Sequence, residues 1–322
     1  MSARISNSEQ DLLQCAAGWA RERKLRDLSD ELLEELTRTK GIDFATAVFY
    51  GRLSARSDVA ELLSRFREEK EQRVAMPTAG LVALVPGALY REFPQTGADG
   101  RAIRDEIERI GWQADLVPVP SGGSPQQNAE YLVEWLERQQ RGNLVLVSLS
   151  KGGADVKCAM TLSGAAEAFK RVIGWINFAG ILDGSPMVEW ACSRWHTRGW
   201  YRAVCKIGGH DFNAFQSLRR NAASPLNFPL RVFSHIETIH VVGVPLRQHL
   251  SSRRARRWHR RLARWGPNDS VTLLTDVLHW PGKVFPVWGT DHYWQERWDA
   301  RSLVPFLLRA ASNTLEPSTS LA

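Results

Sequence analysis

The fold of this chain is decided by residues 142–155, GNLVLVSLSKGGAD. The apolar run at its start predicts a buried strand, and the residues from Gly153 to about Met160 predict a helix. Between them Ser150 is flanked, two positions away on each side, by the small residues Ser148 and Gly152. A strand that turns into a helix across such a serine forms a nucleophile elbow, with the hydroxyl exposed at a strained tip and a helix N-terminus behind it. The alternative is a serine that only caps the helix, and the usual elbow has Gly where Ser148 stands.

Strands and helices alternate on both sides of this stretch. We expect strands at 81–89, 114–120, 144–148, 172–179, 238–244 and 283–288, and helices at 100–111, 124–141, 153–160 and 295–310. Alternation of this kind predicts an α/β fold with a doubly wound, mostly parallel sheet.

The chain divides into four expected regions. They are a helical region at 1–76, the α/β domain at 77–312, a helical cap inserted at about 181–236, and a disordered tail at 313–322. In the first region apolar spacing predicts helices near 12–19, 30–39 and 59–70, with breaks at Gly41 and Gly51. This region has no catalytic constellation and is expected to pack on the main domain or to form a partner surface.

Composition excludes several classes of protein. The 322 residues are 43% hydrophobic and 24% charged, as in ordinary globular proteins, and no apolar run approaches the length of a membrane span. The first residues lack the apolar core of a signal peptide, so we expect a cytoplasmic protein. The four cysteines have neither disulfide-framework nor metal-ligand spacing. Gly208-Gly209-His210-Asp211 resembles a metal-binding pair only superficially, and no metal is expected.

A serine nucleophile needs a base, and a carboxylate to orient that base. His292 lies in a glycine-containing loop between the last expected strand and the last helix, where sites form in open α/β sheets. Two carboxylates compete for the third role. Asp269 is favoured over Asp183, which follows the fourth strand, because a helical run toward the last strand is expected after Asp269. Asp291 is better suited to orienting its own loop.

Ser150, a later acid and His292 follow the chain order Ser…Asp…His, and residues 77–312 resemble the α/β-hydrolase family, in particular its esterase- and lipase-like members. The antiparallel hairpin that often opens this fold is not visible, so a reduced sheet is expected. The resemblance implies oxyanion donors at the backbone amides of Lys151 and Ala88, with Leu89 as the next choice. The Lys151 side chain is expected to form an ion pair with Asp155, four residues on. No cofactor is implied.

The cap and a basic segment carry the remaining signals. Five cap aromatics could cover the serine and shape a pocket, or could form an ordinary core; they are Trp190, Trp195, Trp200, Phe212 and Phe215. Eight arginines crowd residues 247–264, where a solvated helix docked by its tryptophans is favoured over nucleic-acid or membrane-surface binding.

The sequence thus favours a serine hydrolase that cleaves a small-molecule carboxylic ester through an acyl-enzyme at Ser150. A second hypothesis is a thioesterase or acyltransferase that meets an acyl-carrier protein through the arginine-rich segment. A third is a non-catalytic binding protein with the same fold.

Overall fold

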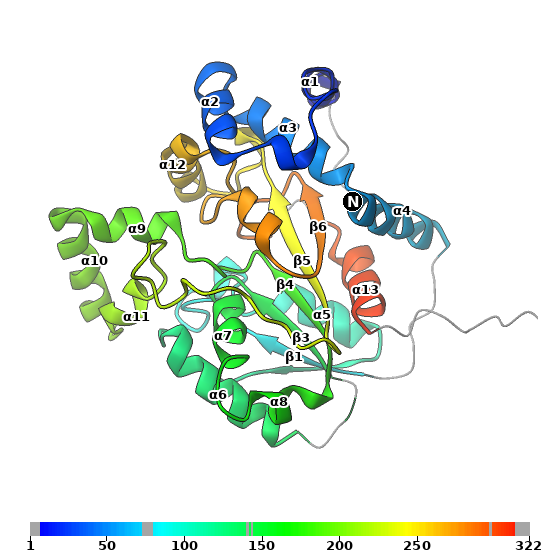
Figure 1. The fold of residues 1–322 in the computed structure, drawn as a ribbon. Helices are drawn as coiled ribbons and strands as arrows, with labels where there is room; N and C mark the ends of the chain where they lie inside the picture. Colours follow the sequence, from blue (N-terminus) through cyan, green and yellow to red (C-terminus); the bar gives the residue numbers. More distant parts are fainter. Residues whose placement is uncertain (1–6, 73–79, 140–141, 143, 296–297, 313–322) are drawn as a thin grey trace, which may run out of the picture.

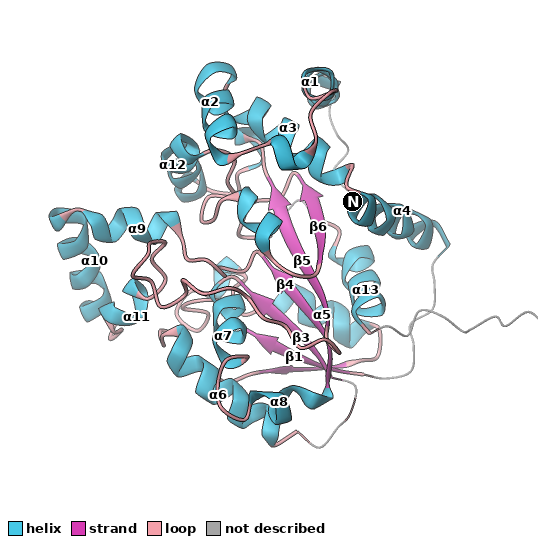
Figure 2. Ribbon diagram, viewed as in Figure 1, coloured by secondary structure: helices cyan, strands magenta, loops and turns pink. Residues whose placement is uncertain are grey.

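The computed structural model describes residues 7–72, 80–139, 142, 144–295 and 298–312. Within them the strands form one sheet in which every neighbouring pair is parallel, in the order β2-β1-β3-β4-β5-β6. The strands are β1 (Leu81–Val85), β2 (Gln113–Leu116), β3 (Leu144–Leu149), β4 (Val172–Phe178), β5 (Glu237–Val244) and β6 (Lys283–Trp288). The expected α/β fold with a reduced sheet is confirmed, and no antiparallel hairpin opens the described part of the sheet (Figure 2).

The helices are arranged around this sheet (Figure 1). Their bounds are α1 (Asn7–Trp19), α2 (Asp30–Lys40), α3 (Ile42–Ser54), α4 (Ser57–Gln72), α5 (Arg101–Arg109), α6 (Pro125–Glu137), α7 (Lys151–Ala159), α8 (Ala165–Ala168), α9 (Pro186–Ser193), α10 (Trp195–Ile207), α11 (Phe212–Gln216), α12 (Arg253–Leu262) and α13 (Ala300–Ala311). Within the described residues no helix is both long and apolar enough to cross a bilayer.

Two apolar layers hold helices on both faces of the sheet. Because successive side chains of a strand point to opposite faces, Leu144 and Leu146 of β3 join the layer under α6 and α7, while Val145 and Val147 join the layer under α5 and α13. Every residue of β3 is buried, which explains the continuous apolar run in the sequence.

The N-terminal helices pack against the β6 side of the sheet. The Tyr50 ring of α3 lies 4.7 Å from Trp288 at the end of β6, and the Phe66 ring of α4 lies 5.4 Å from Phe285. The expected break at Gly41 is present, but the break at Gly51 is wrong because α3 continues to Ser54. Burial of its apolar residues outweighs the low helix propensity of one glycine, about 1 kcal/mol.

Several expected ends shift. β1 stops at Val85, before Pro86, and α13 begins at Ala300 rather than at residue 295. The expected helical run after Asp269 is only a short 3₁₀ helix, Leu274–His279. The domain start near residue 77 and the tail at 313–322 lie outside the described residues. The division into domains therefore stays a prediction.

The strand order has a topological switch point between β1 and β3. The chain leaves β1 for β2 on one side, returns to β3 on the other side of β1, and then continues to β4. Loops after β1 and β3 diverge at such a switch point, which is where open α/β sheets bind ligands. The turn that begins at Pro86 and the residue Ser150 both lie at this point.

Candidate active site

Ser150 lies in a strained turn between β3 and α7. Its φ of 50° and ψ of −115° are unusual for a residue with a side chain, and they turn the chain from strand to helix within one residue. Two backbone bonds fix the turn: the Ser150 amide donates to Phe178 O (2.9 Å), and the Ile181 amide donates to Ser150 O (3.0 Å). A Cβ at Gly152 would lie 2.3 Å from Val85 O, so the position requires glycine. The elbow that the sequence predicts is present.

A buried polar chain lies directly behind the elbow. The Ser148 hydroxyl accepts a bond from Trp175 Nε1 (2.8 Å) and donates to Asn177 Oδ1 (2.9 Å). His240 follows on the next strand, with Nε2 2.9 Å from Pro281 O and Nδ1 3.1 Å from Asn177 Nδ2. Because a carbonyl only accepts, Nε2 carries the proton and Nδ1 accepts from Asn177. Burial lowers the pKa of His240 to about 4, which keeps the ring neutral.

Ser150, His292 and Asp269 form one line of hydrogen bonds. Ser150 Oγ lies 2.8 Å from His292 Nε2, and His292 Nδ1 lies 2.8 Å from Asp269 Oδ2. The other carboxylate oxygen of Asp269 accepts bonds from the amides of Val271 (2.8 Å) and Thr272 (2.7 Å). Burial acts to raise the pKa of Asp269, but the charge and hydrogen bond of His292 and the two amides outweigh it and hold this pKa below its usual value. Asp269 is therefore held as a carboxylate.

Close packing of the loop after β6 positions His292. The Gly289 amide donates to Val244 O (3.0 Å), and a Cβ on Gly243 of β5 would lie 2.4 Å from Thr290 O. The loop can therefore cross β5 only because that residue has no side chain. The His292 amide donates to Asp269 O (3.1 Å), so the histidine and the acid are joined through the backbone as well as through their side chains.

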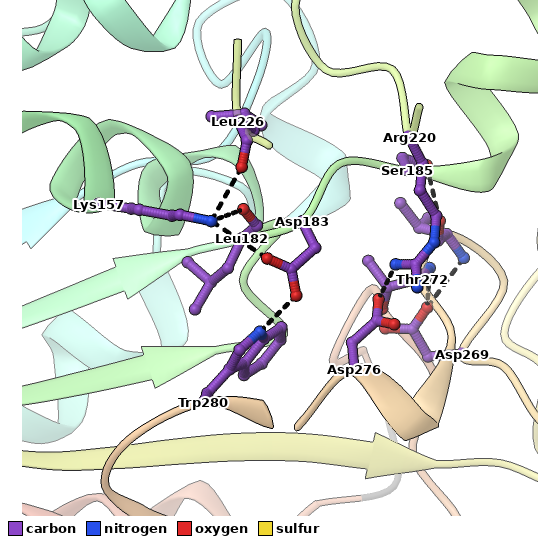
Figure 3. A network of polar contacts seen from close by, with 11 residues as sticks. Lys157, Leu182, Asp183, Ser185, Arg220, Leu226, Asp269, Thr272, Asp276 and Trp280 are labelled. Atoms are coloured by element: carbon purple, nitrogen blue, oxygen red, sulfur yellow. Dashed lines mark hydrogen bonds and ion pairs between the residues drawn. The ribbon is translucent and has the colours of Figure 1, made fainter. Parts of the chain in front are cut away.

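Asp183 lies in a different network (Figure 3). Its Oδ1 is 3.1 Å from Lys157 Nζ, and its Oδ2 accepts a bond from Trp280 Nε1 (2.7 Å). Asp291 accepts a bond from the Tyr293 amide (3.0 Å), which orders its own loop as expected. Its other oxygen accepts bonds from the amide and hydroxyl of Ser251 (2.8 and 2.7 Å), which join this loop to the one before α12. Asp269 is the carboxylate that the structure brings to the imidazole, and the amides of Val271 and Thr272 that hold it were not identified from sequence.

The turn after β1 faces the serine. A Cβ on Gly87 would lie 3.5 Å from Ser150 Cβ. The Gly87 amide donates to Ala98 O (2.8 Å) and the Leu89 amide to Ser121 O (3.0 Å). Among the described residues no backbone carbonyl accepts from the Ala88 amide between them. Ala88 is thus better suited than Leu89 to donate to a ligand.

The amide of Lys151 lies on the other side of the serine, as the first amide of α7, where a helix has no internal acceptor for it. The Lys151 side chain is buried and its Nζ lies 2.7 Å from Asp155 Oδ1, which confirms the expected ion pair. The amino group is therefore engaged by Asp155, which leaves the backbone amide of Lys151 as its donor beside the serine.

The cap aromatics fit the second of their two expected roles, an ordinary core, better than the first. Trp195 and Trp200 of α10 are 87% and 60% exposed, so these two do not form a covered pocket over the serine. Trp190 of α9 instead packs edge-on against Trp258 of α12 (5.3 Å). Phe215 of α11 stacks on Tyr201 of α10 (5.2 Å). These contacts form a small core between the cap helices and α12.

Helix α12 is docked as the sequence predicts. Trp258 and Leu262 are buried, while most of its arginines face solvent. Elsewhere, His210 lies 3.9 Å from Glu92, and no group of three or more His, Cys, Asp or Glu side chains in the described residues could hold a metal ion.

Comparison with solved structures places this architecture among known folds. A metagenomic carboxyl esterase matches with a TM-score of 0.56 at 20% identity, over 74% of this chain and 76% of the other. The propeptide form of a Bacillus licheniformis lipase matches with a TM-score of 0.52 at 18% identity, over 69% of this chain and 48% of the other. No protein-family model matches the sequence, and neither does any curated protein. By its sheet and by these structural matches, the chain has the α/β-hydrolase fold, in a reduced form with six parallel strands in the part that the structure describes.

Proposed function

We propose that this protein is a serine hydrolase that cleaves a carboxylic ester, with Ser150 as nucleophile, His292 as general base and acid, and Asp269 as the carboxylate that orients the imidazole. The observation that carries the proposal is the unbroken line of bonds from Ser150 Oγ through His292 to Asp269, with 2.8 Å at both steps. The carboxyl esterase and the lipase have the same fold, which agrees with ester chemistry.

In the first half of the reaction Ser150 Oγ forms a bond to the ester carbonyl carbon, and its proton passes to His292 Nε2. The amides of Lys151 and Ala88 donate to the oxyanion that develops on the carbonyl oxygen. When the intermediate collapses, the bond from carbon to the alcohol oxygen breaks and His292 returns the proton to that oxygen. The products are an acyl-enzyme and a free alcohol.

In the second half His292 takes a proton from water as the water oxygen bonds to the acyl carbon. Collapse then breaks the bond to Ser150 Oγ, which regains a proton from His292 and releases the carboxylic acid. Asp269 keeps its charge throughout and stabilises the imidazolium that forms twice in the cycle.

Fluorophosphonate labelling tests the proposal with a probe that requires an activated serine and no particular ester. Activated Ser150 should displace fluoride and form a bond to phosphorus, and peptide mass spectrometry should locate the adduct at this residue. Ser150→Ala should remove the adduct, whereas Ser193→Ala, which changes an exposed serine of α9, should leave it unchanged. Folded protein that takes no label at Ser150 would exclude the hydrolase and leave the hypothesis of a non-catalytic binding protein.

A panel of p-nitrophenyl esters of graded acyl length, run beside matched acyl-thioesters, tests the reaction class. Ester turnover should exceed thioester turnover, and Ser150→Ala should lower kcat by at least about 10⁴-fold. Faster turnover of thioesters would favour the thioesterase or acyltransferase hypothesis.

A further inference from the structure

Helix α10 exposes an apolar face to solvent. Trp200, Val204 and Ile207 are spaced as neighbours on one side of a helix, and Trp200 and Ile207 are 60% and 87% exposed. No residue of this helix is buried, and only the side that carries Tyr201 and Cys205 packs on the protein. In Figure 1 α10 lies at the outer edge of the molecule, away from the sheet.

A basic stripe runs along the opposite side of α10 from this apolar face. Arg194 precedes the helix, and Arg198, Arg202 and Lys206 follow it at intervals of four residues. Residues 190–210 contain no Asp or Glu that could neutralise these charges. A shallow open hollow of about 370 Å³ lies along the stripe, with Trp195, Arg198 and Arg202 among its lining residues.

The arginines of α12 extend the same positive surface. The guanidinium groups of Arg194 and Arg261 both lie over the Trp190 ring, 5.7 and 4.3 Å from its centre, so the start of α10 and the end of α12 meet at one indole. Burial raises the pKa of Tyr201 on α10, and the positive charges of Arg254, Arg261 and Arg257 on α12 oppose this rise. The three arginines therefore lie close to α10. Residues 238–268 contain eight arginines and no acidic residue.

We propose that the outer surface formed by α10 and α12, here called the α10–α12 surface, binds the face of a phospholipid bilayer that carries anionic headgroups. Cationic side chains meet the phosphates and carboxylates of the headgroups, and the indole and aliphatic side chains of α10 insert at the boundary of the acyl chains. A helix that combines a Lys/Arg stripe with exposed Trp and Ile has the composition of helices that lie in the membrane interface.

The exposed apolar side chains favour a bilayer over a nucleic acid. A phosphate backbone is met by positive charge alone, and it gives no site in which Val204 and Ile207 could leave water. A lipid surface satisfies both halves of the helix, because burial of the apolar face adds to the attraction of the charges.

Co-sedimentation of the full chain with vesicles tests this inference. Vesicles of equal parts phosphatidylcholine and phosphatidylserine should bind the protein, phosphatidylcholine alone should bind it much more weakly, and added salt should reduce the binding. Arg198→Gln/Arg202→Gln/Lys206→Gln should weaken binding to the anionic vesicles by about 100-fold, since each cation near such a surface contributes about a factor of 5. Trp200→Ala/Ile207→Ala should weaken it more than about 10-fold.

Matched variants on other surfaces give the controls. Arg26→Gln/Arg101→Gln/Arg138→Gln removes three exposed charges elsewhere, and Phe93→Ala/Tyr131→Ala removes two exposed aromatics. Both should bind like the wild type, and so should Ser150→Ala, because the inference does not depend on the proposed catalysis.

Three results would overturn the inference. Wild-type protein could fail to bind anionic vesicles, or the charge variant and its control could lose binding equally. Alternatively, the protein could bind duplex DNA but not vesicles, with the DNA affinity unchanged in Trp200→Ala/Ile207→Ala, which would make the surface a nucleic-acid site.

Discussion

Two carboxylates near the ends of strands, Asp183 and Asp269, have opposite kinds of partner. Asp183 faces the amino group of Lys157, which also donates to Leu182 O (2.7 Å) and Leu226 O (3.0 Å). Asp269 faces the imidazole of His292, which can take up and return a proton during a reaction. A carboxylate paired with a lysine amino group holds chain segments together. A carboxylate bonded to an imidazole can stabilise a charge that appears only during a reaction. The partner, and not the position after a strand, separates the two roles.

Replacing Asp269 and Asp183 in turn by asparagine should give the largest difference in activity between the two sites. Asp269→Asn should lower kcat by about 10⁴-fold, because its NH₂ group would face His292 Nδ1 and impose the wrong tautomer. Asp183→Asn should change kcat by only a few-fold, since Asp183 does not touch the imidazole. Steady-state kinetics with an activated ester, or the rate of fluorophosphonate labelling, measures both.

Urea unfolding of the same two variants provides the control. Asp269→Asn must remain folded for its loss of activity to be chemical. A variant Asp183→Asn that is folded and inactive, beside an active Asp269→Asn, would reverse the assignment of the acid.

The sheet and the candidate site differ in how far the sequence predicts them. Ser150 and His292 followed from their places at the ends of strands, because the carboxyl ends of parallel strands meet at one edge. The preference for Asp269 rested on a helical run expected after it, of which the structure has only a short 3₁₀ helix. The same local patterns did not show which side of α10 faces the protein, since tryptophans and arginines alternate along it. That choice depends on the contacts of Tyr201 and Cys205 with the rest of the cap.

The polar chain behind the elbow also required the structure. Ser148, Asn177 and His240 are direct partners in register across β3, β4 and β5. In the sequence they are isolated polar residues within three apolar runs, and nothing local aligns them. Register between strands is set by the packing of the whole sheet, which one sequence does not specify at this precision.

Removal of the cation beside Asp183 should reduce stability and leave chemistry intact. In Lys157→Met the buried carbonyl Leu182 O loses its donor, while Leu226 O keeps only the bond from the Phe228 amide (2.8 Å), which should lower the free energy of unfolding by about 2 kcal/mol. Urea denaturation measures this loss. Lys170→Met is the matched control, because the Lys170 side chain is half exposed and its pair with Glu167 lies on the surface. Loss of labelling at Ser150 in a folded Lys157→Met protein would contradict the separation of the two networks.

A third carboxylate, Asp276, should make stability depend on pH. Burial raises its pKa to about 7 despite the guanidinium of Arg220, whose Nη1 lies 2.7 Å from Oδ2. In the unfolded chain the pKa is about 4, so between these values the folded protein holds a proton that the unfolded chain releases. The stabilisation is therefore complete below about pH 4 and is lost as the pH rises through 7.

Asp276→Asn tests this directly, because the amide does not titrate. From pH 5 to pH 7 the free energy of unfolding of the wild type should fall by about 2 kcal/mol relative to the variant, as measured by urea denaturation at each pH. The wild type must be compared with the variant at each pH, because burial also lowers the pKa values of His240 and His259 to about 4. These two shifts raise the free energy of unfolding of both proteins as the pH rises over the same range. For the control Asp58→Asn, the difference in free energy of unfolding from the wild type should stay constant between pH 5 and pH 7. Burial acts to raise the pKa of Asp58, but the hydrogen bonds from Arg56 outweigh it and lower this pKa. A flat difference for Asp276→Asn would mean that Arg220 keeps Asp276 ionised in the folded protein.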